Sequence, residues 1–228
     1  MNSVHRLTHA RGARSALALT ALSALLVAPT PATAAKAPAA KPTIALATPR
    51  SFAAAVAAIE KATGSKEMDL ELKGNPLPAG EGRAFRMDGK VATRLVDGSH
   101  APFLKAGLYL FRLERSFGMG GGLDTVALVK TTDRDALIRR VGTSDMHGKL
   151  SSDQIVEWLA ALEKDEPFSL NEIGVDFVAG HFDVAPKDPA AVARRCAEIS
   201  PELTKGSGSA IDLLTEEIRS NRTLYLIW

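Results

Sequence analysis

The sequence predicts an α+β protein with a single domain, in which a mixed β-sheet is flanked by helices and preceded by a signal peptide and a disordered Ala/Pro-rich tether. Three observations predict this fold. In some segments apolar residues recur every three or four positions behind a helix-capping residue. In others they alternate with polar residues or run together, as in strands. No internal repeat is present, and about 180 residues follow the tether, which suits one core better than two.

Residues 1–34 have the order of regions found in a secretory signal peptide. A start with three arginines and no acidic residue leads into the apolar segment 15–28, and small residues follow up to Ala34. The apolar segment is shorter than the roughly 20 residues that span a bilayer, so we expect cleavage near Ala34 and no membrane anchor afterwards. The mature protein is then expected to be periplasmic or secreted.

Residues 35–50 are expected to form a flexible linker because Ala and Pro dominate them. The folded domain is then predicted over residues 51–228. The chain holds 28 Lys and Arg against 26 Asp and Glu, and three of the arginines lie in the leader. The mature chain is therefore close to neutral, which gives no reason to expect a nucleic-acid partner.

The domain is expected to begin with a helix and two strands. Ser51 can cap a helix that has one apolar face and ends near Gly64. The segment Met68–Lys73 alternates strictly between polar and apolar residues, and Val91–Val96 does so loosely. Both are predicted to be strands with one face in water, joined by a loop rich in Pro and Gly.

Two stronger strand predictions are Gly107–Leu113 and Thr125–Val129, joined through the glycine-rich segment 118–122. Such a segment could bind phosphate. Phosphate-binding loops need a helix directly after them, however, to supply amide groups and a dipole. Since a strand follows here, the interpretation as a hairpin tip is favoured.

Two helices are predicted next. Asp133 caps the first, which runs through Arg140. Ser151 and Gln154 form a capping-box pattern ahead of the second, whose apolar face includes Trp158. We therefore expect Trp158 in the core rather than on a ligand-stacking surface.

The last part of the chain is predicted to hold a strand over Ile173–Asp183, a helix over Pro189–Ile199 and a second helix that begins near Ser209. The closing segment Leu224–Trp228 is apolar on both faces, as in an interior strand. Cys196, the only cysteine, shares a helix face with apolar residues, so it is expected to be a buried, inert thiol. A reactive or dimerising thiol is the alternative.

From Lys130 onward the chain reads KTTDRDALIRRVGTSDMHGKLSSDQIVEWLAALEK, then PFSLNEIGVDFVAGHFDVAPKDP, and finally NRTLYLIW. These segments resemble the bacterial domain of unknown function 4253 family over about residues 130–228. The likeness is most specific between Lys130 and Leu162. Because that family has no assigned activity, the resemblance implies a scaffold and no particular chemistry.

The chain departs from the family at its polar motifs. The family tends to have Gly-Thr-Asn-Gly-x-Asn-Tyr at Gly142–Gly148, Cys-Pro-Asp at Ser200–Glu202, glutamine at Lys205 and Trp-Trp-Asp where this chain ends in Ile227-Trp228. If those polar groups form an active site in the family, the resemblance implies that this chain lacks them. It also implies that the α-carboxylate of Trp228 lies near the position of the final aspartate.

The segment from 205 to 209 is the best local binding site in the sequence. Its members are Lys205, Gly206, Ser207, Gly208 and Ser209. Glycines that lead into a helix expose amide groups at the positive end of the helix dipole, so a small anionic ligand or a partner's carboxylate could bind there. The alternative is an ordinary helix start with Ser209 as its cap.

Histidines suggest the remaining chemistry. His147, with Asp145 and Asp153 close in sequence, could act as a general base or as a pH-sensitive contact in a loop. His181 and Asp183 share a strand face and could present two metal ligands together. No third or fourth ligand follows a metal-site spacing, so we expect neither a metal nor a cofactor.

The function that these features favour is a non-catalytic binding module, immunity-like or inhibitor-like, because no nucleophile motif is present. The alternative is an envelope enzyme, of hydrolytic type, in which His147 or His181 acts with Asp145, Asp153 or Glu202. Convergence of His147, Ser200, Glu202 and Lys205 in one pocket would favour the enzyme. Scattered positions would favour binding.

Overall fold

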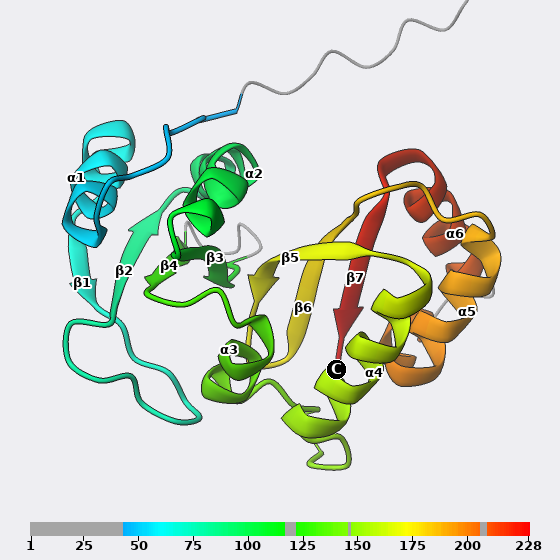
Figure 1. Ribbon diagram of the computed structural model, residues 1–228. Helices are drawn as coiled ribbons and strands as arrows, with labels where there is room; N and C mark the ends of the chain where they lie inside the picture. Colours follow the sequence, from blue (N-terminus) through cyan, green and yellow to red (C-terminus); the bar gives the residue numbers. More distant parts are fainter. Residues whose placement is uncertain (1–42, 117–121, 146, 206–208) are drawn as a thin grey trace, which may run out of the picture. The chain divides into compact units, whose positions relative to one another are not determined.

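A seven-stranded mixed sheet forms the centre of the domain, in the order β1-β2-β4-β3-β5-β6-β7 (Figure 1). The computed structural model describes residues 43–116, 122–145, 147–205 and 209–228, all within the compact unit Ala40–Trp228. The strands are β1 (Glu67–Asp69), β2 (Gly82–Met87), β3 (Tyr109–Glu114), β4 (Asp124–Val129), β5 (Phe168–Ile173), β6 (Phe177–Phe182) and β7 (Thr223–Ile227). Among the described strands only β3 and β5 pair in parallel, which makes the sheet mixed.

Helices cover both faces of this sheet, which confirms the predicted single α+β domain. They are α1 (Phe52–Thr63), α2 (Gly89–Lys105), α3 (Arg134–Val141), α4 (Ser152–Asp165), α5 (Pro189–Ile199), the short 3₁₀ helix η2 (Pro201–Thr204) and α6 (Ala210–Asn221). The predicted signal peptide, and the linker as far as residue 42, lie outside the described residues.

The two faces hold two apolar cores. Helices α3 to α6 pack on one face, over side chains from β3 to β7. Helices α1 and α2 pack on the other, over β2, β3 and β4. Successive side chains of a strand point to opposite faces, so Phe111 of β3 lies in the first core and Leu110 in the second. Among the described residues, no buried apolar side chain of β5, β6 or β7 belongs to the second core.

Several predicted elements are confirmed by their caps. The Ser51 hydroxyl accepts a hydrogen bond from Ala54 N at the start of α1, which ends at Gly64 in the left-handed conformation. Asp133 caps α3, and Ser151 with Gln154 forms the capping box of α4. Each cap depends on residues within one turn, and such local patterns can be recognised in the sequence.

The side chains that were assigned to the core lie there. Trp158 is partly buried against the first core, and Cys196 is buried within it. Burial raises the pKa of the Cys196 thiol to about 12. A thiol with so high a pKa is not ionised near neutral pH and is a poor nucleophile.

The strand predicted over Val91–Val96 is wrong. This segment lies inside α2, which begins where the carboxylate of Asp88 accepts hydrogen bonds from the amides of Lys90 and Val91. The buried residues of the helix recur at helical spacing over 17 residues, and a window of six was too short to show that period.

Three other strand predictions need correction. Of the predicted strand Met68–Lys73, only Met68 and Asp69 lie in a strand, the short edge strand β1. The segment that forms β2 was predicted to be loop because it begins with Gly82. The stretch Ile173–Asp183 is not one strand, since β5 ends at Ile173 and β6 begins at Phe177. The closing segment is not interior, because β7 is an edge strand with alternating burial.

His100 is a buried titratable group that the sequence did not explain. It belongs to α2, where its Nδ1 donates to the carbonyl oxygen of Leu110 over 2.7 Å, while its Nε2 has no partner among the described residues. Burial lowers the pKa of His100. The neutral imidazole is therefore the form that fits the folded protein.

Stability is expected to decrease as the pH falls below about 6.5, the ordinary pKa of histidine, because the unfolded chain then takes up a proton that folded His100 resists. The decrease continues until the pH passes the lowered pKa of the folded state. The variant His100→Gln should flatten this part of the profile, measured by urea unfolding at several pH values. Asp97, whose pKa burial raises, contributes with the opposite sign but is present in both proteins. Equal pH dependence in the two proteins would contradict the assignment.

Candidate functional site

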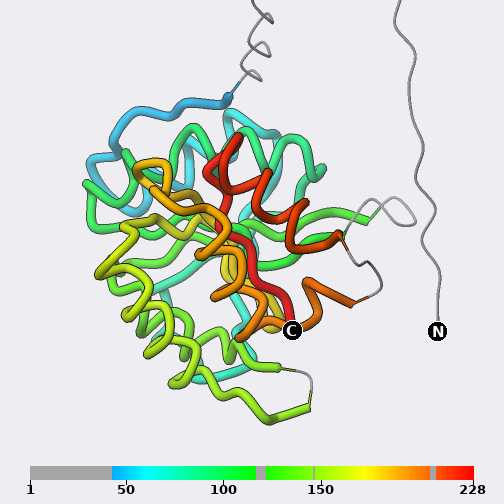
Figure 2. Tube along the Cα trace, turned by 90° about the vertical axis from the view of Figure 1, so that its right-hand side faces the viewer, coloured from blue at the N-terminus to red at the C-terminus, as the bar shows by residue number. Residues whose placement is uncertain are grey.

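Three segments that are distant in the sequence line one pocket, which we call the C-terminal pocket. They are the loop between α3 and α4, the end of α5 together with helix η2, and Trp228, which follows β7. Figure 2 shows the backbone of these segments. The pocket measures about 490 Å³. Its lining consists of the apolar residues Leu150, Ile199, Pro201 and Trp228, the acidic residues Asp145, Glu198 and Glu202, and the basic residues His147, Lys149 and Lys205.

The loop between α3 and α4 is held by its own polar groups. The Thr143 hydroxyl donates to the carbonyl oxygen of Gly174, and the amide of Ser144 donates to that of Val175. The carboxylate of Asp145 accepts from the amide of Leu150 over 3.0 Å and so closes the loop. Asp145 is therefore part of the loop's structure as well as of the pocket wall.

Ser200 and Trp228 fix the other side of the pocket. Fully buried Ser200 exchanges two hydrogen bonds with Ile227 at the outer edge of β7: its hydroxyl donates to the carbonyl oxygen over 2.5 Å and accepts from the amide over 3.0 Å. The indole of Trp228 donates to the carbonyl oxygen of Ile199 over 2.8 Å. Ser200, at the end of α5, thus covers one position of the edge strand β7. The amide and carbonyl groups of Ile227 at that position would otherwise be unpaired.

Replacement of Ser200 by alanine is expected to lower the free energy of unfolding by about 1–3 kcal/mol, since two part-buried backbone groups of Ile227 lose their partner. Urea unfolding measures this loss. The control is Ser169→Ala, which removes a hydroxyl from an exposed residue that contacts Asp183. An unchanged midpoint for Ser200→Ala would show that the buried hydrogen bonds do not stabilise the edge.

The C-terminal pocket brings together four of the predicted site residues, Asp145, His147, Glu202 and Lys205. His147 is exposed at its rim. Glu202 and Lys205 line it and form an ion pair with each other. Ser200 lies directly beneath, between Ile199 and Pro201, but its hydroxyl is engaged with Ile227. The convergence of His147, Glu202 and Lys205 is the outcome that favours an enzyme. The Ser200 hydroxyl, however, is bonded to Ile227 and is therefore not available as a nucleophile.

Other predicted residues lie elsewhere. Asp153 projects from α4 and pairs with Arg139 at 2.6 Å, outside the pocket. His181 is exposed on β6, and Asp183 accepts a hydrogen bond from Ser169. In the part of the chain that the structure describes, no three His, Cys, Asp or Glu side chains are grouped to hold a metal ion.

The predicted binding segment 205–209 is only partly described. Gly206, Ser207 and Gly208 lie outside the described residues. Ser209 occupies the N-cap position of α6, and its side chain makes no capping hydrogen bond to that helix. Lys205, at the other end of the segment, directs its ammonium group to Glu202.

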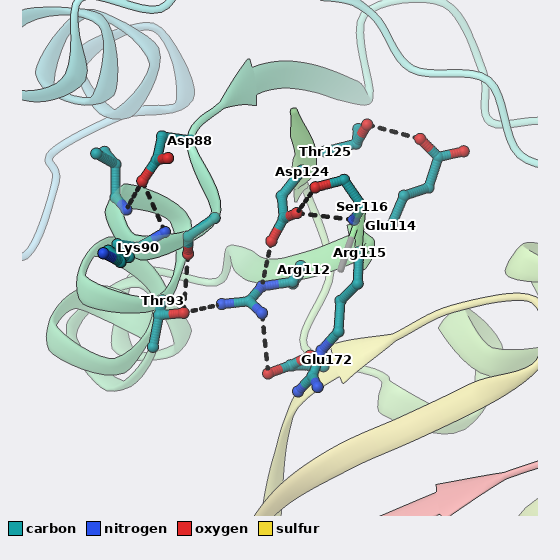
Figure 3. A network of polar contacts seen from close by, with 12 residues as sticks. Asp88, Lys90, Thr93, Arg112, Glu114, Arg115, Ser116, Asp124, Thr125 and Glu172 are labelled. Carbon is teal, nitrogen blue, oxygen red and sulfur yellow. Dashed lines mark hydrogen bonds and ion pairs between the residues drawn. The ribbon is translucent and has the colours of Figure 1, made fainter. Parts of the chain in front are cut away.

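A second polar site, which the sequence analysis missed, lies on the opposite face of the sheet (Figure 3). The guanidinium of Arg112 on β3 lies between three side chains. Its Nη2 donates to the hydroxyl of Thr93 on α2, its Nε lies 3.5 Å from a carboxylate oxygen of Asp124, and its Nη1 lies 3.8 Å from Glu172. Arg115 also contacts Glu172, at 2.5 Å. Arg112, Asp124 and Glu172 are all buried.

Strand irregularities help to position these charges. The pairing of β3 with β4 shifts by one residue between Arg112 and Glu114, and that of β5 with β6 shifts between Leu170 and Glu172. A bulge lets two successive side chains share a face, and bulges are common beside functional sites. Asn171 and Glu172 accordingly both point toward α2, where Asn171 donates to Asp97 over 2.9 Å.

One signal in the sequence could have located this site. On the face under α1 and α2, Leu108 and Leu110 begin an apolar row along β3 that Arg112 continues. Along β4, Asp124 lies two residues before the buried Val126 and therefore on the same face of the strand. An ionisable residue at a position where the alternation predicts a buried apolar side chain indicates a buried polar site. Glu172 could not be added this way, because a bulge interrupts the alternation in β5.

Comparisons with known proteins give one match. No curated protein and no solved structure matches the chain. In the described part of the chain, every helix is too short or too polar to cross a membrane. The resemblance inferred from the sequence is confirmed, since residues 125–228 match the family described as Domain of unknown function (DUF4253).

Proposed function

We propose that the protein is an exported, non-catalytic binding module that recognises a protein partner through the C-terminal pocket. The observation that carries this proposal is the convergence of three segments on a pocket with an apolar floor and a charged rim. Binding sites in proteins commonly combine an apolar lining with a few well-placed polar groups. An inhibitor-like or immunity-like role, directed at a toxin or a hydrolase, is the concrete form of the proposal.

The charges of the rim favour a basic side chain of the partner. Three carboxylates, those of Asp145, Glu198 and Glu202, line the pocket with two lysines. Lys205 is neutralised by Glu202, so of the two lysines only Lys149 is left to balance the other two acids. Glu198 is exposed, and no ion pair involves it in the described part of the chain. A lysine or arginine that enters the pocket would gain a charge-assisted hydrogen bond there, whereas a small anion would meet an excess of negative charge.

Three of the groups that could act in catalysis are engaged in structural contacts. Asp145 closes its loop, Glu202 pairs with Lys205, and the hydroxyl of Ser200 bonds to Ile227. Nucleophilic catalysis needs a nucleophile and a base within hydrogen-bond reach of each other. These contacts support recognition over turnover.

Co-purification from an envelope extract, with the purified protein as bait, tests the proposal. We expect a partner that is retained at low salt and released at higher salt, since the rim charges are partly exposed. Glu198→Lys should abolish direct binding of that partner, measured by calorimetry. Glu157→Lys, an exposed glutamate on α4 outside the pocket, should leave binding unchanged. Equal loss in both variants, or in neither, would overturn the role of the pocket.

A hydrolase is the second candidate, because His147 does share the pocket with Asp145 and Glu202. Here His147 would act as the general base. His147→Gln should then abolish the turnover of a small ester or amide substrate while leaving the fold intact. If the purified protein turns over such a substrate and the variant does not, the binding proposal fails and the enzyme replaces it.

Export is part of the proposal and has its own test. We expect the mature protein to begin at Ala35 and to accumulate outside the cytoplasm. Mass spectrometry of the protein from fractionated cells measures both the first residue and the compartment. A cytoplasmic protein that keeps residues 1–34 would contradict export without affecting the assignment of the pocket.

A further inference from the structure

We propose that a groove at one end of the sheet binds an extended, basic segment of a partner protein that also carries apolar side chains. Two pockets, of about 400 and 390 Å³, share Arg86, Leu113 and Glu114 and so form one groove, which we call the transverse groove. It runs from Met68 on β1 to Ile227 on β7. Among the described residues none lines both this groove and the C-terminal pocket, so the proposal is independent of the function proposed above.

Apolar side chains in contact with water are the first reason. Four large apolar side chains are exposed in the described part of the chain. Two of them line this groove, Met68 with 46 % and Leu123 with 45 % of its surface exposed. The groove also holds the half-buried side chains of Leu70, Val175 and Ile227. Single apolar residues are ordinary on a protein surface, but several that line one groove indicate an interaction site.

The charge of the groove is the second reason. Its lining carries four carboxylates against two guanidinium groups. The acids are Asp69, Glu71, Glu114 and Asp176, and the bases are Arg86 and Arg115. The ion-pair partners Glu172 and Arg83, which lie outside the lining, carry opposite charges and leave the negative excess unchanged. Lysine or arginine side chains of a partner complement this excess, whereas an acidic segment is repelled.

The length of the groove indicates an extended segment. The sheet order places six spacings between β1 and β7, each of about 4.8 Å, so the groove crosses roughly 29 Å. An extended chain rises about 3.3 Å per residue, so about nine residues cover this distance. The carboxylates of Glu71 and Glu114 are exposed. Lysine side chains are long enough to reach them while apolar neighbours in the same segment pack on Met68 and Leu123.

Fluorescence anisotropy of a labelled peptide tests the proposal. The probe has about nine residues, with lysine and valine in alternation and blocked ends, to match the length of the groove. It is titrated with the full protein at physiological salt, and we expect saturable binding. Two comparison peptides, one with glutamate in place of lysine and one with serine in place of valine, should bind about tenfold more weakly or worse. If the probe shows no saturable binding, the proposal is wrong.

Matched variants locate the binding. Leu123→Ser removes apolar contact area and should weaken binding roughly three- to tenfold, whereas Leu213→Ser, exposed on α6, should not. Glu71→Lys should weaken binding by a similar factor, and Glu217→Lys, also exposed on α6, should leave it unchanged. All four side chains are exposed, so the fold is expected to tolerate these changes. Equal losses in the groove variants and in the α6 variants would reveal non-specific adsorption and overturn the proposal.

Two further measurements identify other occupants. Glu198→Lys should leave binding of this peptide unchanged. If it abolishes binding while Glu71→Lys does not, the peptide occupies the C-terminal pocket, and this proposal fails while the function proposed above stands. Sedimentation velocity of the protein alone should give a monomer. A dimer that Leu123→Ser dissociates would assign the groove to a second copy of the chain and would also overturn the proposal.

Discussion

Replacement of Arg112 by alanine is expected to lower the free energy of unfolding by about 3–5 kcal/mol. Arg112 is the common partner of Asp124 and Glu172, whose side chains are only 5 % and 11 % exposed. Without it Asp124 keeps no ion pair among the described residues, and Glu172 keeps only Arg115. A carboxylate that is buried without a counter-charge loses its hydration, and the hydrogen bonds that Ser116 donates to Asp124 replace that hydration only in part. Urea unfolding, followed by circular dichroism, measures the change.

Two further variants test the reason for this loss. Adding Asp124→Asn to Arg112→Ala removes the carboxylate that has lost its ion pair and should restore part of the stability. The control Arg139→Ala breaks the exposed pair with Asp153 and should leave the unfolding curve unchanged. If Arg112→Ala is no less stable than this control, the network does not stabilise the fold.

Gly180→Ala is expected to have a comparable effect, about 3 kcal/mol or more, or to prevent folding. A methyl group at Gly180 of β6 would lie 2.0 Å from the carbonyl oxygen of Ser169 and 2.8 Å from the Cα of Leu170. Both atoms belong to the backbone of β5, so no side chain can rotate to make room. Strands β5 and β6 would have to separate inside the sheet. The dispersion of amide signals in an NMR spectrum, together with urea unfolding, measures the effect.

A second glycine provides the comparison. Gly64 ends α1 with a φ of 72°, and nothing lies within 4 Å of a methyl group added there. Gly64→Ala should therefore cost only the strain of the left-handed conformation, about 1–2 kcal/mol. If Gly180→Ala is as mild as Gly64→Ala, the strands β5 and β6 are able to adjust, and the close approach does not require glycine.

The helices show what short-range pattern can predict. The caps of α1, α3 and α4 were identified because Ser51, Asp133 and Ser151 act on amides within the next three residues. Helix α5 was predicted with the bounds that the structure has, from an N-terminal proline and a face of small and apolar residues. Helix α2 was missed because a loosely alternating stretch of six residues fits both periods.

The strands show where such prediction stops. Whether a strand lies at the edge or in the interior depends on its neighbours, and Leu224–Trp228 is apolar on both sides although β7 is an edge strand. Its outer side meets Ser200 and α6 instead of another strand. A residue's own sequence neighbours do not reveal a cover that comes from another part of the chain.

The two sites show the same division between what the sequence predicts and what only the tertiary structure reveals. Loop chemistry and the family resemblance identified His147, Asp145, Glu202 and Lys205 one by one, as residues able to bind or to catalyse. Their meeting in the C-terminal pocket required the return of β7 beside α5. The contact between Arg112 and Glu172 required the parallel pairing of β3 with β5, across 60 residues of sequence.

By itself the sequence determined the fold class, the caps of α1, α3 and α4, the buried thiol and the likeness of about residues 130–228 to the DUF4253 family. These depend on periodicity, local hydrogen bonds and composition, which act over a few residues. The tertiary structure alone decided which strands are edges, which polar residues share a pocket and which charges are buried together. Those depend on strand order and on register, and a shift of one residue in either strand would move Arg112 away from Glu172.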